Sequence, residues 1–261
     1  MTFNNTALQK FLCRFDFKQG LSGYIGVERE HFLVLPCGTL VPRAPEFLER
    51  VRDPRWTYEL SACQIESRTK PHRDLLALKL ELLQNGNNGS LVAERMGLRL
   101  VNREVASKTM PLDVFPNPRY ARITRSIPIK QLQAACRVAG THIHLGTKNM
   151  EHAIRTHNAL IGHLDELSRL GDHSEGKRLK LYKAMAKRWL PAPYENEEHF
   201  FENAQANGFA ENPRDCWTLI RISAHGTVEV RAFGVTDHVD EILHWISRVW
   251  SILQAEDVHH A

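Results

Sequence analysis

The chain has 261 residues, of which 43% are hydrophobic and 25% are charged, as is usual for a globular protein with a sizeable core. Its net charge of +4 is only mildly basic and fits an anionic substrate, although a surface excess of Lys and Arg would give the same number. We expect a small-molecule substrate and no nucleic-acid partner. The sequence shows no signal peptide and no apolar stretch long enough for a membrane, and its five cysteines are an odd, unpaired set that does not suit a secreted disulfide scaffold. We therefore expect a cytoplasmic protein with reduced thiols.

The first informative element is a predicted strand from Ser22 to Leu35, after an opening stretch, Ala7–Phe17, that fits either a helix or a strand. Alternate side chains of a strand share a face, so Glu28 and Glu30 point one way and Arg29 the other. Two carboxylates this close repel each other unless a cation lies between them. The pair is therefore either half of a metal site or a solvated strand face.

Residues 40–43 are expected to return along this strand as a hairpin, and residues 46–51 to form a short helix behind Pro45. Trp56 to Thr69 is predicted as the next strand, but its apolar pattern changes parity near Ser61. A β-bulge would explain the change and would let Glu59 and Glu66 face the same site. Alternatively, Glu59 lies in a loop before a shorter strand.

The middle of the chain alternates between predicted helices, strands and loops. Six leucines between Arg73 and Gln84 indicate a buried helix, which the run of Asn and Gly at residues 85–89 should end. The further elements that we predict are a helix at 90–96, a strand at 98–105, a proline-rich loop at 110–118, a helical turn at 119–125, helices at 149–170, 177–190, 195–207 and 239–253, and a hairpin of strands at 217–223 and 227–233.

Two later strands repeat the pattern of Glu28 and Glu30. The strand at residues 140–147 carries His142 and His144, and the strand at 227–233 carries Glu229 and Arg231, in each case on one face with apolar residues on the other. An antiparallel sheet with one packed face has this alternation. If the strands are neighbours, their polar faces form one surface lined with carboxylates, imidazoles and a guanidinium.

Two shorter patterns are weaker. Residues 171–178 approach a phosphate-binding loop but lack its Ser or Thr and a preceding strand, so we interpret them as a loop between helices. The HxH pair His142 and His144 suits zinc, for which Cys63 and Cys136 are conceivable further ligands without helpful spacing. A zinc-dependent hydrolase is therefore the alternative functional hypothesis.

Four motifs in order resemble the glutamate–cysteine ligase superfamily, and most closely its carboxylate–amine ligase branch. They are Gly-Val-Glu-Arg-Glu at 26–30, the pair Glu59 and Glu66 with Thr69 and Pro71 after it, Gly-Thr-His-Ile-His-Leu-Gly at 140–146, and Gly-Thr-Val-Glu-Val-Arg at 226–231. The resemblance implies an α+β fold, with a curved, mainly antiparallel sheet as in glutamine synthetase and guanido kinases. The site would lie on the concave face and helices on the other face, within one catalytic domain spanning residues 1–261.

The resemblance also assigns roles to residues of this sequence. It implies one magnesium cluster formed by Glu28, Glu59 and Glu66, and further metal positions held by Glu30, His142 and Glu229. Arg231 would hold the transferred phosphoryl group. Arg119 would bind phosphate or substrate, and His144 fills a neighbouring place in the nucleotide site.

The implied activity is ATP-dependent joining of a carboxylate, such as that of glutamate, to an amine. ATP would convert the carboxylate to an acyl phosphate, which the amine then displaces. Mg²⁺, or Mn²⁺ in its place, suits such a site because hard cations bind phosphate and carboxylate oxygens together. The region after residue 170 lacks the long stretch that shapes the acceptor pocket of larger members, so glutamate and cysteine are only the default substrates.

Overall fold

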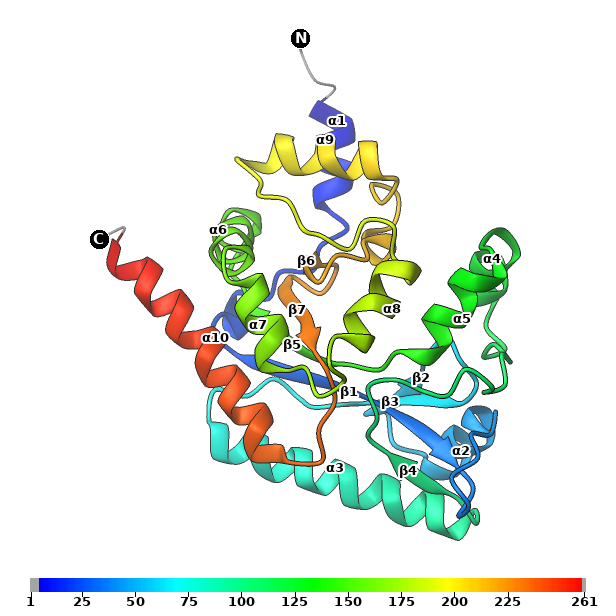
Figure 1. Ribbon diagram of the computed structural model, residues 1–261. Coiled ribbons are helices and arrows are strands. Elements are labelled where there is room, and N and C mark those ends of the chain that lie inside the picture. Colours follow the sequence, from blue (N-terminus) through cyan, green and yellow to red (C-terminus); the bar gives the residue numbers. More distant parts are fainter. Residues whose placement is uncertain (1–4, 260–261) are drawn as a thin grey trace.

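A computed structural model of the protein describes residues 5–259 (Figure 1). One sheet contains the strands β1 Ile25–Val34, β2 Trp56–Tyr58, β3 Gln64–Arg68, β4 Arg99–Val101, β5 Thr141–Gly146, β6 Ile220–Ser223 and β7 Thr227–Phe233. The α-helices are α1 Asn5–Leu12, α2 Ala44–Val51, α3 Leu75–Arg95, α4 Pro118–Ser126, α5 Ile129–Arg137, α6 Met150–Ile161, α7 Leu164–Leu170, α8 Lys177–Met185, α9 Glu197–Asn207 and α10 Val239–His259. Two 3₁₀ turns, Gln19–Leu21 and Pro213–Asp215, complete the elements.

The strands pair in the order β2-β3-β1-β5-β7-β6, with β4 also paired to β1, and every pairing is antiparallel. The three motif-bearing strands β1, β5 and β7 are therefore neighbours in the centre of the sheet. This arrangement confirms the predicted α+β class with an antiparallel sheet. It also brings the polar faces of these strands together.

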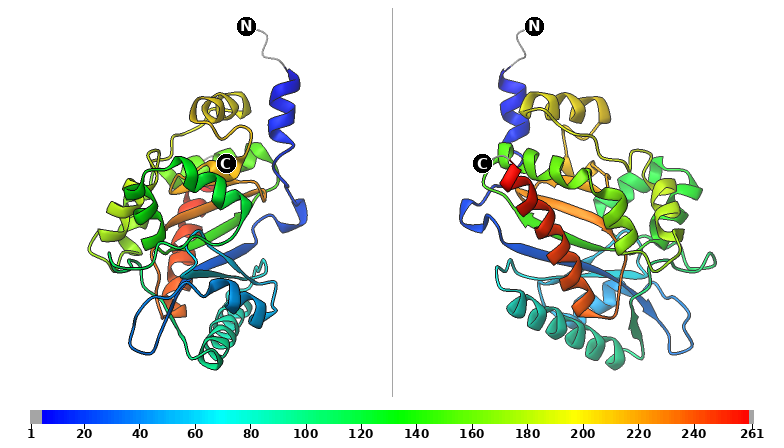
Figure 2. Two further views of the ribbon diagram at one scale, coloured as in Figure 1. Left: turned by 90° about the vertical axis from the view of Figure 1, so that its right-hand side faces the viewer. Right: turned by 60° about the vertical axis from the view of Figure 1, so that its left-hand side comes forward.

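The opposite face of the sheet carries the main hydrophobic core. Val27, Ile143 and Val230 are at most 1% exposed and pack against apolar residues of α3, α6 and α10. In Figure 2, α10 (red) crosses behind the strands in the left view and in front of them in the right view, and α3 runs below the sheet in both. Burial of one face by helices leaves the other face of the same strands for polar side chains. Among residues 5–259, no helix combines the length and the hydropathy needed to cross a bilayer.

The single strand predicted from Trp56 to Thr69 is wrong, because this stretch is a hairpin. β2 and β3 run antiparallel, with Thr57 opposite Glu66, and residues 59–63 form the connection. The change of parity near Ser61 marks this turn and is not a bulge. The alternative, in which Glu59 lies in a loop beside a shorter strand, is confirmed.

The helix break predicted at residues 85–89 is also wrong, since α3 runs unbroken from Leu75 to Arg95. Asp74 begins the helix by accepting hydrogen bonds from the N–H groups of Leu76 and Ala77. Within the Asn and Gly run, Asn85 donates to the carbonyl of Arg68, and Gly89 lies so close to Trp56 that a Cβ would sit 2.4 Å from the indole ring. These residues attach the helix to the sheet instead of ending it.

The leucines of α3 are not all buried, contrary to prediction. Leu78 and Leu82 enter the core, whereas Leu76 and Leu80 are 63% and 60% exposed. Leu83 and Leu91 are exposed on the same outer side of the helix. The sequence contains more apolar residues here than the core accepts.

Other boundaries differ in detail from the predictions. The opening stretch at 7–17 is helical only as far as Leu12, where α1 ends. The return strand at 40–43 is reduced to a bridge between Val34 and Leu40, and α5 was not predicted. The helix predicted at 149–170 is divided at Gly162 into α6 and α7, and the helix predicted at 177–190 ends at Met185, after which Ala186 is extended. The hairpin of β6 and β7 is confirmed, although β6 begins only at Ile220.

Candidate active site

A cleft of about 210 Å³ lies over the polar face of the central strands. All the predicted site residues except Glu30 line it, and Glu30 lines an adjoining chamber of about 40 Å³ together with Glu59, His142 and Arg231. The residues selected from sequence are therefore brought together by the fold. In particular, Glu59 and Glu66 share the cleft, as predicted, although a hairpin connection and not a bulge brings them there.

The strand register explains this convergence. Glu28 lies directly opposite His142 across β1 and β5, and His144 lies opposite Glu229 across β5 and β7. On the other side of β1, Glu30 lies opposite Glu66. Directly paired residues in an antiparallel sheet hold their side chains close together, so each ligand-capable group meets one from the next strand.

The Glu28 carboxylate lies between the two imidazoles. Its Oε2 is 3.2 Å from Nδ1 of His142 and 3.3 Å from Nε2 of His144. Burial opposes ionisation of Glu28, but the charge of His144 and the hydrogen bonds from both rings hold its pKa well below the usual value. Burial likewise disfavours protonated His144, yet the carboxylates of Glu28 and Glu229 outweigh it and raise the pKa of His144. In this corner of the cleft, the fold places a carboxylate between two imidazole rings.

The carboxyls of Glu30, Glu59 and Glu66 form a second group in which like charges meet. Burial, followed by the nearby charge of Glu59, raises the pKa of Glu30 to about 7. Burial and then the charges of Glu28 and Glu59 raise the pKa of Glu66 well above its usual value. Without a cation, burial and mutual repulsion therefore disfavour ionisation of these side chains.

Glu229 is fully buried between two arginines. Arg221 donates to both of its oxygens, at 2.7 and 3.1 Å, and Arg231 donates to Oε1 at 2.5 Å. Burial works against the charge of Glu229, but the two guanidinium groups lower its pKa below the usual value. Sequence reasoning missed Arg221, although the register of the predicted hairpin places it directly opposite Glu229.

Arg231 is held on its other side by helix α8. Its Nε donates to the hydroxyl of Tyr182 at 3.1 Å. Arg178, one turn before Tyr182 in α8, is buried. It donates to the carbonyls of Ala139, Arg231 and Ala232, which fixes α8 against the strand ends. Arg231 is thus oriented by a carboxylate and a phenol while its side chain lines both the cleft and the chamber.

Arg119 stands at the start of α4 and lines the cleft from above the sheet. Its Nη2 lies 3.0 Å from Oδ1 of Asp215 and donates to the carbonyl of Arg214 at 3.3 Å. Asn117 accepts the N–H of Arg119 and donates to the hydroxyl of Tyr58, which joins α4 to the strand β2. Arg119 is therefore placed to bind an anion in the cleft. To do so, its guanidinium must either break the ion pair with Asp215 or bind Asp215 and the anion together.

The donor set fits divalent cations. Among the described residues, the ligand atoms of Glu28, His142 and Glu229 lie within 4.8 Å of one another, as do those of Glu30, Glu66 and His142. Nε2 of His144 is buried and lies 3.3 Å from Oε2 of Glu28. The grouping differs from the one predicted, because His142 joins both sets and Glu59 lies beside Glu66 outside either set. The metal role of each residue remains a prediction.

The structure gives the zinc hypothesis no cysteine ligand. Cys63 and Cys136 are buried away from both carboxylate groups, and burial raises the pKa of the Cys63 thiol to about 11 and that of Cys136 to about 12. Zinc thiolate sites need a deprotonated sulfur. The phosphate-loop pattern fails as well, since the carboxylate of Asp172 already accepts the N–H groups of Ser174 and Gly176.

Comparison with known proteins identifies relatives of this chain. The family model described as Glutamate-cysteine ligase family 2 matches residues 24–164, more than half of the chain. The glutamate–cysteine ligase of Natronomonas pharaonis is 26% identical over 255 residues, covering 89% of this chain and 70% of the relative. The enzyme of the same name from Halobacterium salinarum is 25% identical over 232 residues, covering 81% of this chain and 64% of the relative.

A solved structure shares the fold. The bifunctional glutathione synthetase from Pasteurella multocida aligns with a TM-score of 0.55 and 13% identity, covering 97% of this chain and 40% of that protein. At this identity the likeness concerns the fold alone. The chain thus spans about two thirds of these curated relatives and less than half of the solved protein.

Proposed function

The chain belongs to glutamate–cysteine ligase family 2, and from this premise we propose that it is an ATP-dependent carboxylate–amine ligase. The observation that carries the proposal is the meeting of two potential cation groups with Arg231 in the cleft and its adjoining chamber. Glutamate is the first carboxylate to test, because the relatives are named glutamate–cysteine ligases. The zinc-hydrolase alternative has no observation in its favour.

The reaction has two balanced steps. An oxygen of the carboxylate attacks the γ-phosphorus of ATP, the bond to the bridging oxygen breaks, and ADP leaves with the electron pair. The amine nitrogen then attacks the acyl carbon, the bond to the phosphate oxygen breaks, phosphate leaves, and the nitrogen gives up a proton. The product is an amide.

The residues of the chain would favour these steps by position and charge. Glu28, Glu30, Glu66, His142 and Glu229 would hold Mg²⁺, which when bound would supply positive charge to offset that of the phosphates. Arg231 presents a planar fork that matches two oxygens of the transferred phosphoryl group. Glu229 and Tyr182 hold that fork in place, so little reorganisation is needed in the transition state.

The raised pKa values of Glu30 and Glu66 support this use of cations. Each of these carboxyls is buried next to other acids, and only a positive charge would let both ionise near pH 7. Divalent cations would supply that charge. The protein should accordingly bind ATP poorly without a divalent cation.

Calorimetric titration with ATP tests the proposal, first with Mg²⁺ and then with excess EDTA. We expect the affinity to fall by at least about tenfold in EDTA, because the carboxylates then repel the phosphates. A screen for ADP release over amino acids and amines identifies the substrates, and metal analysis of the purified protein checks for stoichiometric zinc. Unchanged ATP affinity in EDTA, or zinc together with ATP-independent hydrolysis, would refute the ligase proposal.

A further inference from the structure

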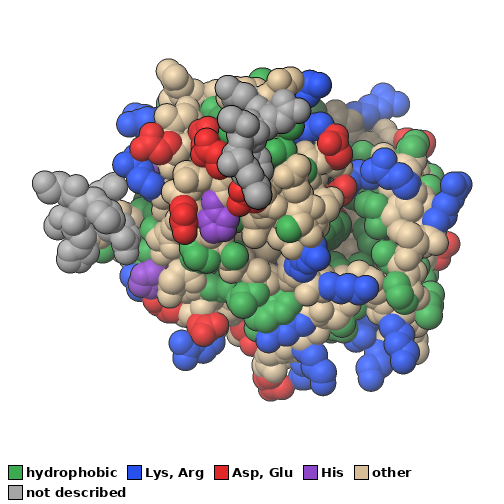
Figure 3. All heavy atoms as spheres, turned by 90° about the horizontal axis from the view of Figure 1, so that it is seen from above, with side chains coloured by type: hydrophobic (Ala, Val, Ile, Leu, Met, Phe, Trp, Pro, Cys, Tyr) green, Lys and Arg blue, Asp and Glu red, His purple; other side chains and the backbone are tan. Residues whose placement is uncertain are grey.

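A large pocket of about 750 Å³ lies beside the small chamber that contains Glu30 and Arg231. It lies between α4 and α5 on one side and, on the other, residues 185–194, α9 and the segment that leads into β6. Seen from above, the surface is hollowed on the α4 side, with hydrophobic side chains in the hollow and Lys and Arg side chains around it (Figure 3). The mechanism described so far gives this pocket no role.

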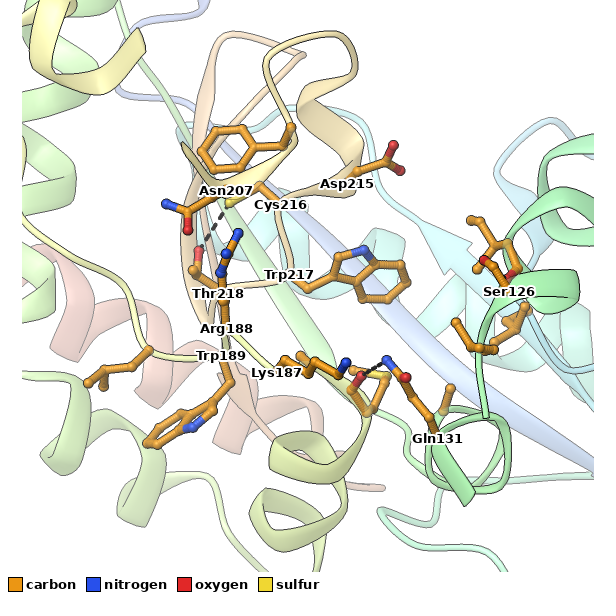
Figure 4. Close-up of a pocket in the computed structure, with 18 of the residues that line it drawn as sticks. Ser126, Gln131, Lys187, Arg188, Trp189, Asn207, Asp215, Cys216, Trp217 and Thr218 are labelled. Carbon is orange, nitrogen blue, oxygen red and sulfur yellow. Dashed lines mark hydrogen bonds between the residues drawn. The ribbon is translucent and has the colours of Figure 1, made fainter. Parts of the chain in front are cut away.

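The pocket adjoins the small chamber that contains Glu30 and Arg231. Leu60, Ala135, Met185 and Trp217 line both spaces, and Trp217 also lines the metal-binding cleft. Figure 4 shows the indole of Trp217 projecting into the open space between Asp215, Ser126 and Lys187. A molecule that occupies the pocket can therefore place one end beside Trp217. That position borders the chamber of Glu30 and Arg231, where the acyl phosphate would form.

The wall of the pocket is largely apolar and aromatic. Its contributors include Ile123, Ile127, Trp189, Leu190, Tyr194 and Phe209. Its polar side chains are mostly engaged already: Gln131 donates to the carbonyl of Met185 at 2.6 Å, Thr218 donates to that of Ile220, and Asn207 donates to Asn203. Such a wall favours ligands with apolar surface, because few of its polar groups remain free to form hydrogen bonds with a ligand.

The nucleotide phosphates belong on the other side of the chamber. Five arginines, Arg68, Arg119, Arg214, Arg221 and Arg231, line the metal-binding cleft among its carboxylates. The only cations on the wall of the large pocket, among the described residues, are Lys187 and Arg188, and both are exposed. The cleft is thus the better match for the metal-bound phosphates of ATP. The apolar pocket then remains for the second substrate.

We infer that this pocket binds the acceptor, and that the acceptor is a primary amine carried on a bulky, largely apolar or aromatic body and not cysteine. The inference rests on the proposed ligase function and adds the class of the second substrate. The pocket has far more room than a cysteine side chain would fill. The amine nitrogen would enter past Trp217 and attack the acyl carbon, releasing phosphate as described above.

The test separates activation of the carboxylate from use of the acceptor. Hydroxylamine is a small amine that traps acyl phosphates as hydroxamates and needs no large pocket. With ATP, Mg²⁺ and a panel of amino acids and dicarboxylates, hydroxamate formation reports the first step and identifies the carboxylate. ADP release with phenethylamine or tryptamine, compared with cysteine, then reports the acceptor.

A matched pair of variants locates the acceptor. Ile127→Trp fills the pocket, whereas Ile129→Trp adds the same ring two residues further on, at a side chain that is 60% exposed and does not line the pocket. We expect the wild type to use the aromatic amines at least about tenfold more efficiently than cysteine, since even one methylene group changes selection by a factor of about ten or more. Ile127→Trp should lose that activity by a similar factor and keep hydroxamate formation, and Ile129→Trp should keep both.

Each other outcome overturns the inference in a distinct way. Preference for cysteine over both aromatic amines would show that the acceptor class is wrong. Weaker ATP binding by Ile127→Trp, but not by Ile129→Trp, would assign the pocket to the nucleotide. Trp189→Ala, which enlarges the pocket, provides a second variant if Ile127→Trp does not fold, and it should slow the aromatic amines while sparing hydroxamate formation. If the wild type forms neither hydroxamate nor ADP with any substrate, the ligase proposal fails, and this inference fails with it.

Discussion

Replacing Arg231 by lysine should separate the chemical step from nucleotide binding. Arg231 makes two side-chain hydrogen bonds, to Oε1 of Glu229 at 2.5 Å and to the hydroxyl of Tyr182 at 3.1 Å. A lysine keeps the charge and one of these bonds but lacks the planar fork. We therefore expect ATP affinity in Mg²⁺ within about threefold of the wild type. Turnover should fall by about a hundredfold to a thousandfold, the usual cost of removing one preorganised transition-state donor.

Arg221→Lys is the matched control, because Arg221 binds the same carboxylate. Arg221 donates to both oxygens of Glu229 and to the carbonyl of Cys216 at 2.8 Å, and makes a longer bond to the carbonyl of Arg214 at 3.4 Å. Of the three shorter bonds lysine loses about two, whereas it loses about one at Arg231. A hydrogen bond to a charged group contributes about 1.5–3 kcal/mol. Arg221→Lys should thus be the less stable variant, by about 2 kcal/mol, and yet lose turnover by only about tenfold or less.

The two variants should rank in opposite orders for stability and for activity. Urea unfolding gives the stability, calorimetry gives ATP affinity, and the hydroxamate assay gives turnover at saturating ATP. If the variants rank in the same order by both measures, Arg231 acts only by supporting Glu229. If ATP affinity collapses in Arg231→Lys while turnover at saturation is normal, Arg231 is a binding group and its assigned role in phosphoryl transfer is wrong.

Three further predictions concern the acidic cluster, helix α3 and a buried histidine. Glu66→Gln should raise the melting temperature in EDTA at pH 7.5, because it removes a carboxyl that is crowded by Glu28 and Glu59. The same change should weaken Mg²⁺-ATP binding by about tenfold or more. A lower melting temperature in EDTA would contradict the crowding. Gly86→Ala should stabilise the protein by about 0.5–1 kcal/mol, because a Cβ at residue 86 meets nothing within 4 Å. Gly89→Ala should destabilise it, because a Cβ at residue 89 would lie 2.4 Å from the ring of Trp56. Equal effects of the two changes in thermal unfolding would refute this account of the helix. Burial lowers the pKa of His157 to about 4, so as the pH falls the unfolded chain takes up a proton before the folded chain does. The free energy of unfolding should therefore decrease by up to about 3 kcal/mol between about pH 6.5 and about pH 4. Urea unfolding of His157→Gln should show a pH dependence shallower by that amount, and an unchanged slope would exclude His157 as the source.

The active-site strands were predictable because alternation along a strand is a local property. Glu28, His142 and Glu229 each share a face with a second ligand-capable residue, and the fold only had to place three such strands side by side. The hairpin at Glu59 was harder, since a turn and a bulge change the parity of an apolar pattern in the same way. Only the pairing of Thr57 with Glu66, which is a property of the tertiary structure, distinguishes them.

Helix α3 shows where local propensity is overruled by packing. Its Asn and Gly run has the composition of a loop, yet Asn85 binds the carbonyl of Arg68 and Gly89 allows Trp56 to approach. Neither partner is close in the sequence. Arg178 and Tyr182 were missed for a similar reason, because nothing near them in the chain indicates that α8 packs on the end of β7 and reaches Arg231.

The anchoring of α8 by Arg178 has a consequence for anyone who wishes to redesign this enzyme. The helix carries Tyr182, which orients Arg231, and Met185, which lines both the chamber and the large pocket. Gly140 leaves room for the guanidinium, as a Cβ there would lie 2.4 Å from Nη2 of Arg178. Libraries aimed at new acceptors should therefore vary α5 and residues 186–192 and leave α8 unchanged, because a shift of α8 would alter selectivity and phosphoryl transfer together.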